Sequence, residues 1–179
     1  MVIDPPYNNT GCKLGYGLLE DSEWMDAISF DALMGDGLIF FWVTNAKGST
    51  VESFMARRGW MLKEQVEWIK VNRHNQLHTR SGYYLSHVRE TCQVYKRAKP
   101  KMKDCEYLRP RQAPNAIICP IRGRVSSKPV QLYEIVEALV PHGPYIELFG
   151  RVNNQREGWL TVGNEAVEYQ IKEDQQTNY

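Results

Sequence analysis

The sequence lacks the features that mark several classes of protein. Its four cysteines lie far apart with no CxxC pair, and its four histidines show no metal-ligand spacing, so we expect no metal site. It has no run of about 18 apolar residues, which argues against a membrane span. No signal peptide is visible, because Met1 leads directly into a predicted strand. The separated cysteines fit a reducing compartment.

A strong excess of charge is also missing. The formal net charge is +1, whereas a protein that binds nucleic acid alone usually carries a clearer basic excess. Positive charge is instead local, in "KRAKPKMK" (96–103), "RPR" (109–111) and "RGR" (122–124). Each cluster is either a solvated loop or part of a polyanion-binding surface. For a polyanionic substrate, we expect a partner subunit to supply more of the charge.

The length of 179 residues suits one compact domain. Helical and strand patterns alternate along the sequence. Apolar periodicity predicts helices over 21–34 (with Asp21 or Ser22 as N-cap), 49–59, and 128–140 (with Pro129 in the first turn). The continuous apolar run 37–43 predicts a buried parallel strand, and further strands are predicted at 65–71, 90–97, 116–121, 144–150 and 158–165. This alternation predicts an α/β sheet with helices on both faces.

Two polar segments directly follow predicted strands. These are "DPPY" (4–7) and "FGRVNN" (149–154). Ligands of open α/β sheets bind beyond the carboxyl ends of the strands. We therefore expect both segments to project into one crevice, although they are far apart in the sequence.

The "DPPY" segment has the groups needed to activate an aromatic amine such as that of adenine. The lone pair of this amine is delocalised into the ring, so a site helps by accepting hydrogen bonds from both amine hydrogens. Asp4 supplies one acceptor, and a carbonyl of Pro5 or Pro6 supplies the second, held without competing donors because proline fixes φ and has no N–H. Tyr7 offers a flat face on which a base can stack. The structural alternative is a strand that ends in a proline turn, but the nearby "GYG" favours the functional interpretation.

The order of motifs is that of a known family. "DPPY", "SSKP", "ELFGR" and "VGN" occur in this order, together with "DGLIFFWVTN", "VEWIKVN" and "TRSGYYLSHVRETC". The sequence closely resembles the eukaryotic adenine N6-methyltransferase family of the messenger-RNA methylase type (MT-A-seventy), over nearly the whole chain. The resemblance implies a Rossmann-like, S-adenosylmethionine-dependent methyltransferase fold in which the catalytic motif precedes the donor-binding motif. We expect the methyltransferase domain at 1–170, without its N-terminal portion, and a polar tail at 171–179.

The resemblance also implies roles for individual residues. The catalytic residues are Asp4, Pro5, Pro6 and Tyr7; the cofactor-binding residues are Asp4, Lys128, Glu147, Arg151, Asn154, Asn164 and Glu165; the substrate-binding residues are Tyr7, Tyr16, Glu90 and Lys128. Glu147 is either a donor contact or an acid satisfied at the end of its strand.

Three departures from the family pattern stand out. Tyr7 replaces the usual tryptophan, which puts the substrate preference in question, and Glu165 replaces the usual glutamine. The sequence begins too late to contain an acidic donor contact that relatives carry upstream of the motif. Either the sequence is a fragment, which we expect, or the contact comes from elsewhere.

The resemblance implies a nuclear enzyme that methylates the N6 amine of adenine in DNA or RNA, as the catalytic subunit of a heteromeric complex. We expect a heterodimer with a degenerate paralogue through the loop at 72–84, and possible further nucleic-acid-binding subunits; the alternative for this loop is a plain surface loop. Two other functions stay open: a catalytically silent subunit that supports substrate binding, or a methyltransferase that acts on a protein amide.

Overall fold

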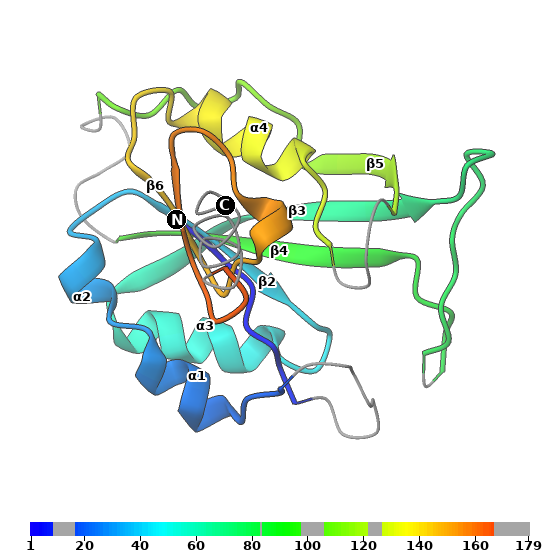
Figure 1. Cartoon of the computed structure of the whole chain (residues 1–179), viewed down its shortest axis with the longest axis horizontal. Helices are drawn as coiled ribbons and strands as arrows, with labels where there is room; N and C mark the ends of the chain where they lie inside the picture. Colours follow the sequence, from blue (N-terminus) through cyan, green and yellow to red (C-terminus); the bar gives the residue numbers. More distant parts are fainter. Residues whose placement is uncertain (9–16, 83, 98–105, 122–126, 167–179) are drawn as a thin grey trace, which may run out of the picture. The chain divides into compact units, whose positions relative to one another are not determined.

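The computed structural model describes residues 1–8, 17–82, 84–97, 106–121 and 127–166, except for the side chains of Phe30 and Asp31. The helices are α1 (Asp21–Ala27), α2 (Phe30–Leu33), α3 (Gly48–Arg57), α4 (Gln131–Leu139) and the 3-10 helix η2 (Val152–Asn154). The strands are β1 (Val2–Ile3), β2 (Leu38–Val43), β3 (Trp60–Val71), β4 (Arg89–Arg97), β5 (Ala116–Pro120), β6 (Tyr145–Leu148) and β7 (Trp159–Val162). Figure 1 shows these elements.

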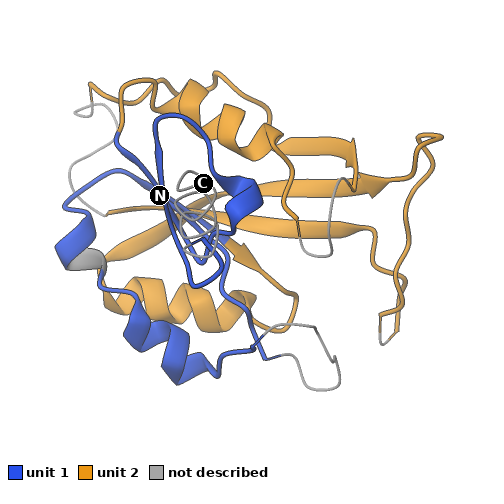
Figure 2. Ribbon diagram, viewed as in Figure 1, with its two compact units in different colours: residues 1–41, 144–179 blue, residues 42–143 orange. Residues whose placement is uncertain are grey.

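The chain has an α/β fold with a seven-stranded mixed sheet in the order β5-β3-β4-β2-β1-β6-β7. It divides into two compact units, coloured separately in Figure 2. Unit 1 comprises residues 1–41 and 144–179, and unit 2 comprises residues 42–143. The predicted polar tail at 171–179 lies outside the described residues. In the described part, no helix combines the length and apolarity needed to cross a membrane.

The strands of unit 1 are parallel, and β1 lies between β2 and β6. Strand β2, which follows β1 in the sequence, lies on one side of β1 in the sheet. On the other side of β1 lies β6, and β7, which follows β6, lies beyond it. The point between β1 and β6 is therefore the topological switch point at which α/β sheets bind ligands. Ile39, Phe40 and Phe41 of β2 are fully buried, which confirms the predicted buried parallel strand.

The predicted helix over 21–34 is wrong in its extent. Helix α1 ends at Ala27, because Ile28 adopts an extended conformation and is buried. The predicted N-caps are also wrong: Glu20 holds that position, and its N–H donates to the Glu23 carboxylate at 2.6 Å. The helix buries Trp24 completely. A carboxylate in the first turn also suits the positive end of the helix dipole.

In unit 2, β3 pairs antiparallel with β4 and parallel with β5, which makes the sheet mixed. The predicted loop after β3 contains two isolated bridges, Val71 with Leu77 and Arg80 with His87. The first bridge folds the segment back onto the end of β3, and the second pairs it with the residues just before β4.

The two longest helices lie on opposite sides of β3 and β4 (Figure 1). Helix α3 buries Val51, Phe54 and Met55, at the i, i+3 and i+4 spacing of one helix face. The prediction of Pro129 in the first turn of α4 is wrong, because the helix begins at Gln131. The Pro129 carbonyl instead accepts a hydrogen bond from the Leu132 N–H in a tight entry turn.

Candidate active site

The Asp-Pro-Pro-Tyr segment begins where β1 ends, beside the switch point. The Asp4 N–H donates to the Leu148 carbonyl at 3.4 Å, which ties the start of the segment to the end of β6. Strand β7 ends at the same level, because Val162 is in register with Leu148. Within unit 1, the segments that follow β1, β6 and β7 therefore begin at one edge of the sheet. That "DPPY" and "FGRVNN" project into one crevice remains a prediction.

The Pro-Pro carbonyls differ from the prediction in one respect. The Pro5 carbonyl accepts a hydrogen bond from the Tyr7 N–H at 2.9 Å, and the Pro6 carbonyl accepts one from the Leu19 N–H at 2.8 Å. The expectation that these carbonyls have no competing donors is therefore wrong. Each carbonyl oxygen still has a second lone pair, so its capacity to accept from an amine remains.

Tyr7 is buried rather than open to a ligand. Only 6% of its surface is exposed, and its ring meets the Trp24 ring edge to face, with the centroids 5.8 Å apart and the planes at 87°. Stacking of a base on Tyr7 remains a prediction, and it requires a ring face that this conformation does not expose. The other predicted aromatic, Tyr16, lies outside the described residues.

The turns after β6 and β7 approach each other closely. The Gly150 N–H donates to the Val162 carbonyl at 3.1 Å. A Cβ at Gly163 would lie 2.2 Å from the Gly150 carbonyl oxygen, so no side chain fits there. Phe149 has a φ of 61°, a left-handed conformation that bulky residues rarely adopt and that clusters at functional sites.

Four of the predicted donor-binding residues of unit 1 lie in two pairs. Arg151 Nε and Glu165 Oε2 are 3.2 Å apart, which links the segments after β6 and β7. Asn154 Nδ2 donates to Glu147 Oε1 at 2.8 Å, and Glu147 is 1% exposed. Asn164 is exposed. The Asn154 bond accounts for one oxygen of the Glu147 carboxylate, so both alternatives for Glu147, a donor contact or an acid satisfied within the protein, stay open.

Unit 2 contains a cluster of three charged side chains, hereafter the Lys–Glu–Lys cluster, formed by Lys70, Glu90 and Lys128. Glu90 forms ion pairs with both lysines, at 3.1 Å to Lys128 Nζ. The lysine side chains are only 12% and 11% exposed. The sequence pointed to Glu90 and Lys128 but not to Lys70. The signal for Lys70 is strand alternation, which places it on the same face of β3 as Trp68.

Two tryptophans lie beside the lysine heads. Lys70 Nζ is 4.6 Å from the centroid of the Trp68 ring, and Lys128 Nζ is 4.9 Å from that of Trp42. The two rings meet edge to face, with centroids 6.4 Å apart. Such cation–π contacts stabilise a lysine that is largely removed from water.

The charges of this cluster determine the protonation of Glu90. Burial raises the pKa of the Glu90 carboxyl. The charges of Lys128 and Lys70, and the hydrogen bonds that they donate, lower this pKa by a larger amount, so that its value is about 2. Glu90 is therefore ionised at neutral pH. Two lysines and one glutamate leave the cluster with a net charge of 2 − 1 = +1.

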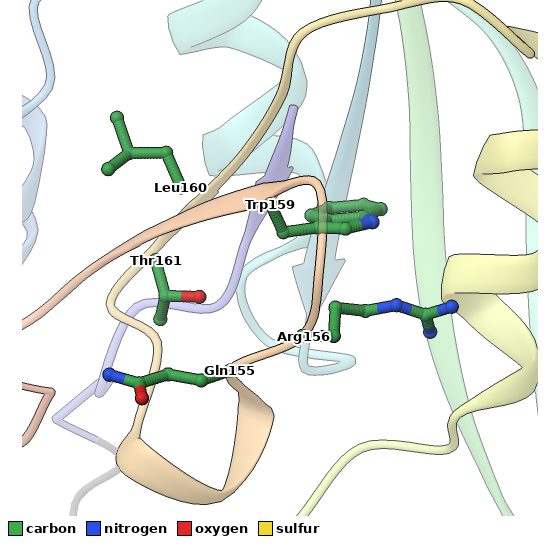
Figure 3. A pocket seen from close by; sticks show the side chains of 5 residues that line it. All are labelled: Gln155, Arg156, Trp159, Leu160 and Thr161. Atoms are coloured by element: carbon green, nitrogen blue, oxygen red, sulfur yellow. The ribbon is translucent and has the colours of Figure 1, made fainter.

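Unit 1 contains a pocket of about 430 Å³, whose lining side chains are drawn in Figure 3. It is lined by the side chains of Gln155, Arg156, Trp159, Leu160 and Thr161. None of the predicted site residues lines it. Among the described residues, no group of three or more His, Cys, Asp or Glu side chains could hold a metal ion.

The chain is similar to known proteins over most of its length. Residues 1–165 match the model of the MT-A70 family. The chain is 32% identical over 171 residues to the Drosophila melanogaster "N(6)-adenosine-methyltransferase MT-A70-like protein", an alignment of 92% of this chain and 26% of that protein. It is 30% identical over 171 residues to the Homo sapiens "N(6)-adenosine-methyltransferase catalytic subunit METTL3" (92% and 27%).

A relative of a different kind also matches. The chain is 25% identical over 174 residues to the Xenopus tropicalis "N(6)-adenosine-methyltransferase non-catalytic subunit METTL14", an alignment of 91% of this chain and 38% of that protein.

The family match covers most of the sequence, so the chain belongs to the MT-A70 family. It is a homologue of N6-adenosine methyltransferases. It spans about a quarter of the length of the first of these relatives.

Proposed function

We propose that this chain is the catalytic subunit of a nuclear, heteromeric S-adenosylmethionine-dependent methyltransferase that modifies the N6 amine of adenine in nucleic acid. The observation that carries the proposal is the Asp-Pro-Pro-Tyr segment at the carboxyl end of β1, next to the switch point, in a chain of the MT-A70 family. A Rossmann-like fold with the catalytic motif before the donor-binding motif is part of the proposal.

Asp4 acts on the acceptor. Its carboxylate accepts a hydrogen bond from the adenine amine, and the second lone pair of a Pro5 or Pro6 carbonyl accepts the other. These bonds draw the nitrogen towards a tetrahedral geometry and make its lone pair available. Positioning contributes more here than proton transfer. The fixed φ of both prolines keeps the acceptors in place.

The side chains after β6 and β7 fit the donor by their chemistry. The pairs Arg151–Glu165 and Asn154–Glu147 offer a guanidinium, an amide and two carboxylates at one edge of unit 1, which suit the hydroxyls of a ribose and the polar edge of a purine. With Asn164, these residues would hold the adenosine portion. S-adenosylmethionine supplies a methyl group that is already activated by its sulfonium.

The Lys–Glu–Lys cluster contributes positive charge. Its net charge of +1 suits an anionic group. We assign Lys128 to the carboxylate of the donor's methionine portion. Glu90 holds the two ammonium groups in place, and we also assign it a contact with the acceptor.

The decisive experiment replaces the Asp4 carboxylate. We expect Asp4→Ala to reduce methyl transfer to an adenine oligonucleotide to background, while the Kd for S-adenosylmethionine stays largely unchanged. Asp26→Ala, at an exposed acid of α1, is the matched control and should retain full activity. Methyl transfer by Asp4→Ala at the wild-type rate would refute the acceptor role. Assays with DNA, RNA and a glutamine peptide identify the acceptor class.

A silent subunit is the second candidate, and the similarity to a non-catalytic METTL14 favours it. Titration of the whole complex with S-adenosylmethionine separates the two candidates, using a partner that is itself unable to bind the donor. If S-adenosylmethionine still binds, and substitution of Arg151 weakens this binding, the result supports the catalytic subunit. Absence of binding supports the silent one.

The proposed partner surface is the loop at 72–84, with the adjoining Leu85. Three large side chains here are strongly exposed: Leu77 (59%), Tyr84 (90%) and Leu85 (77%). Exposed apolar groups of this size on a connecting segment are typical of protein interfaces. We propose that a degenerate paralogue covers them, and that other subunits add nucleic-acid binding.

A further inference from the structure

We propose that Trp24 is a positioning residue for the Asp-Pro-Pro-Tyr segment, acting through Tyr7, which anchors the end of the segment. This inference rests on the proposed methyltransferase function. It assigns a task to a helix that carries no predicted site residue.

The segment is held at both ends. At its start, the Asp4 N–H is bonded to the Leu148 carbonyl of β6. At its end, Tyr7 forms a parallel bridge with Leu19, made by the Leu19 N–H to the Pro6 carbonyl (2.8 Å) and the Asn8 N–H to the Leu19 carbonyl (3.1 Å). Because φ is fixed at Pro5 and Pro6, the orientation of the segment depends on where these two ends are held.

The second anchor belongs to helix α1. Asn8 Nδ2 donates to Glu20 Oε1 at 2.5 Å, and Glu20 is the N-cap of the helix. The Trp24 N–H donates to the Glu20 carbonyl, and its indole Nε1 donates to Asp21 Oδ1 at 3.1 Å. The indole is therefore fixed in orientation by its own helix.

Trp24 connects this helix to both the segment and the sheet. It is 0% exposed, and its ring contacts the rings of both Tyr7 and Phe41 of β2, with centroids 5.8 and 5.6 Å apart. Phe41 is in register with Ile3, the residue before Asp4. The three rings thus form a continuous packed path from β2 through α1 to Tyr7.

A shorter side chain at position 24 would leave space beside Tyr7 and let the end of the segment move. A displacement of about 1 Å in a group that positions substrate can reduce the rate by about 100-fold. We expect the effect to fall on the turnover rate, because the ring contacts of Trp24 lead to Tyr7 of the Asp-Pro-Pro-Tyr segment and to Phe41 of β2, whereas the proposed donor site is formed by the residues that follow β6 and β7.

The experiment compares Trp24→Leu, Trp24→Phe and Trp60→Leu in the full chain with any partner that activity requires. Trp60 is the matched control, since it is also 0% exposed but lies in unit 2 beside Arg97. We expect Trp24→Leu to lower kcat about tenfold or more, with Kd for S-adenosylmethionine within about twofold, and Trp24→Phe to recover most of kcat. Trp60→Leu should lose stability and keep kcat.

Amide hydrogen exchange provides a readout that does not need activity. In Trp24→Leu, the N–H groups of Tyr7, Asn8 and Leu19 should exchange faster, while the amides of β3 and β4 keep their protection. If Trp24→Leu does not fold, Trp24→Met takes its place. Unchanged exchange at these three amides, or equal kcat in Trp24→Leu and Trp60→Leu, would overturn the proposal. If the wild type transfers no methyl group, the proposed function fails and hydrogen exchange alone decides the positioning role.

Discussion

Glu90 should make the stability of this protein depend on pH in a defined window. Its carboxyl has a pKa of about 2 in the folded chain, against an ordinary value of 4.5, because Lys128 and Lys70 outweigh the effect of burial. A depressed folded pKa means that the unfolded chain binds the proton more tightly. The stabilisation is therefore complete above about pH 4.5 and is lost as the pH falls from there towards 2.

The size of the effect follows from the shift. A difference of about 2.5 between the two pKa values corresponds to about 3 kcal/mol. Since 32% of the Glu90 side chain is exposed, screening by solvent reduces this to about 2 kcal/mol. The Glu90→Gln variant cannot lose a proton here, so its free energy of unfolding should lie below that of the wild type at pH 6 and approach it at pH 3.

Urea denaturation between pH 3 and pH 6, followed by tryptophan fluorescence, measures this difference. The wild-type curve should be steeper than that of Glu90→Gln by up to about 1.4 kcal/mol per pH unit. Lys128→Met and Lys70→Met each keep the carboxylate and remove one cation, so each should give an intermediate slope. Parallel curves for the wild type and Glu90→Gln over the whole range would refute the electrostatic account of the cluster.

Two further predictions concern packing and association. Gly163→Ala should destabilise the chain by about 3 kcal/mol or more in denaturant titrations, because its Cβ would lie 2.2 Å from the Gly150 carbonyl oxygen. The control Gly35→Ala, whose Cβ would have no neighbour within 4 Å, should change stability much less, and equal losses would contradict the steric explanation. Leu85→Ser should weaken binding to the proposed partner about tenfold in calorimetric titrations without changing the unfolding midpoint of the chain alone. Unchanged affinity would exclude this residue from the interface.

Local patterns predicted the elements whose burial is uniform along their length. Strand β2 was predicted because its apolar run has the length of a strand and is buried on both faces. The helix predicted over 21–34 was wrong because periodicity cannot show that Ile28 turns away to be buried in an extended conformation. The entry to α4 was misplaced for a similar reason, since the Pro129 carbonyl caps an entry turn whose form depends on tertiary context.

In the candidate site, too, local patterns predicted some features, whereas those that depend on tertiary contacts were missed. The positions of Asp4, Arg151 and Asn164 at strand ends were predicted, because the carboxyl ends of parallel strands meet at one edge. Lys70 was missed because its contact with Glu90 depends on the register between β3 and β4. The burial of Tyr7 was missed because its partner, Trp24, lies on a helix after an intervening segment whose course the sequence does not reveal.

The charges of the Lys–Glu–Lys cluster limit what Glu90 can do. A carboxylate with a pKa of about 2 is a weak base at neutral pH, so Glu90 is unsuited to remove a proton from an amine. Its ion pairs instead compensate one of the two positive charges that Lys70 and Lys128 hold against Trp68 and Trp42. The remaining charge of +1 is matched by one negative charge from a ligand, such as a carboxylate. A ligand with two negative charges would leave one of them uncompensated beside the indole rings. We therefore expect the cluster to favour a monoanionic group, and in the proposed function the activation of the acceptor amine is left to Asp4.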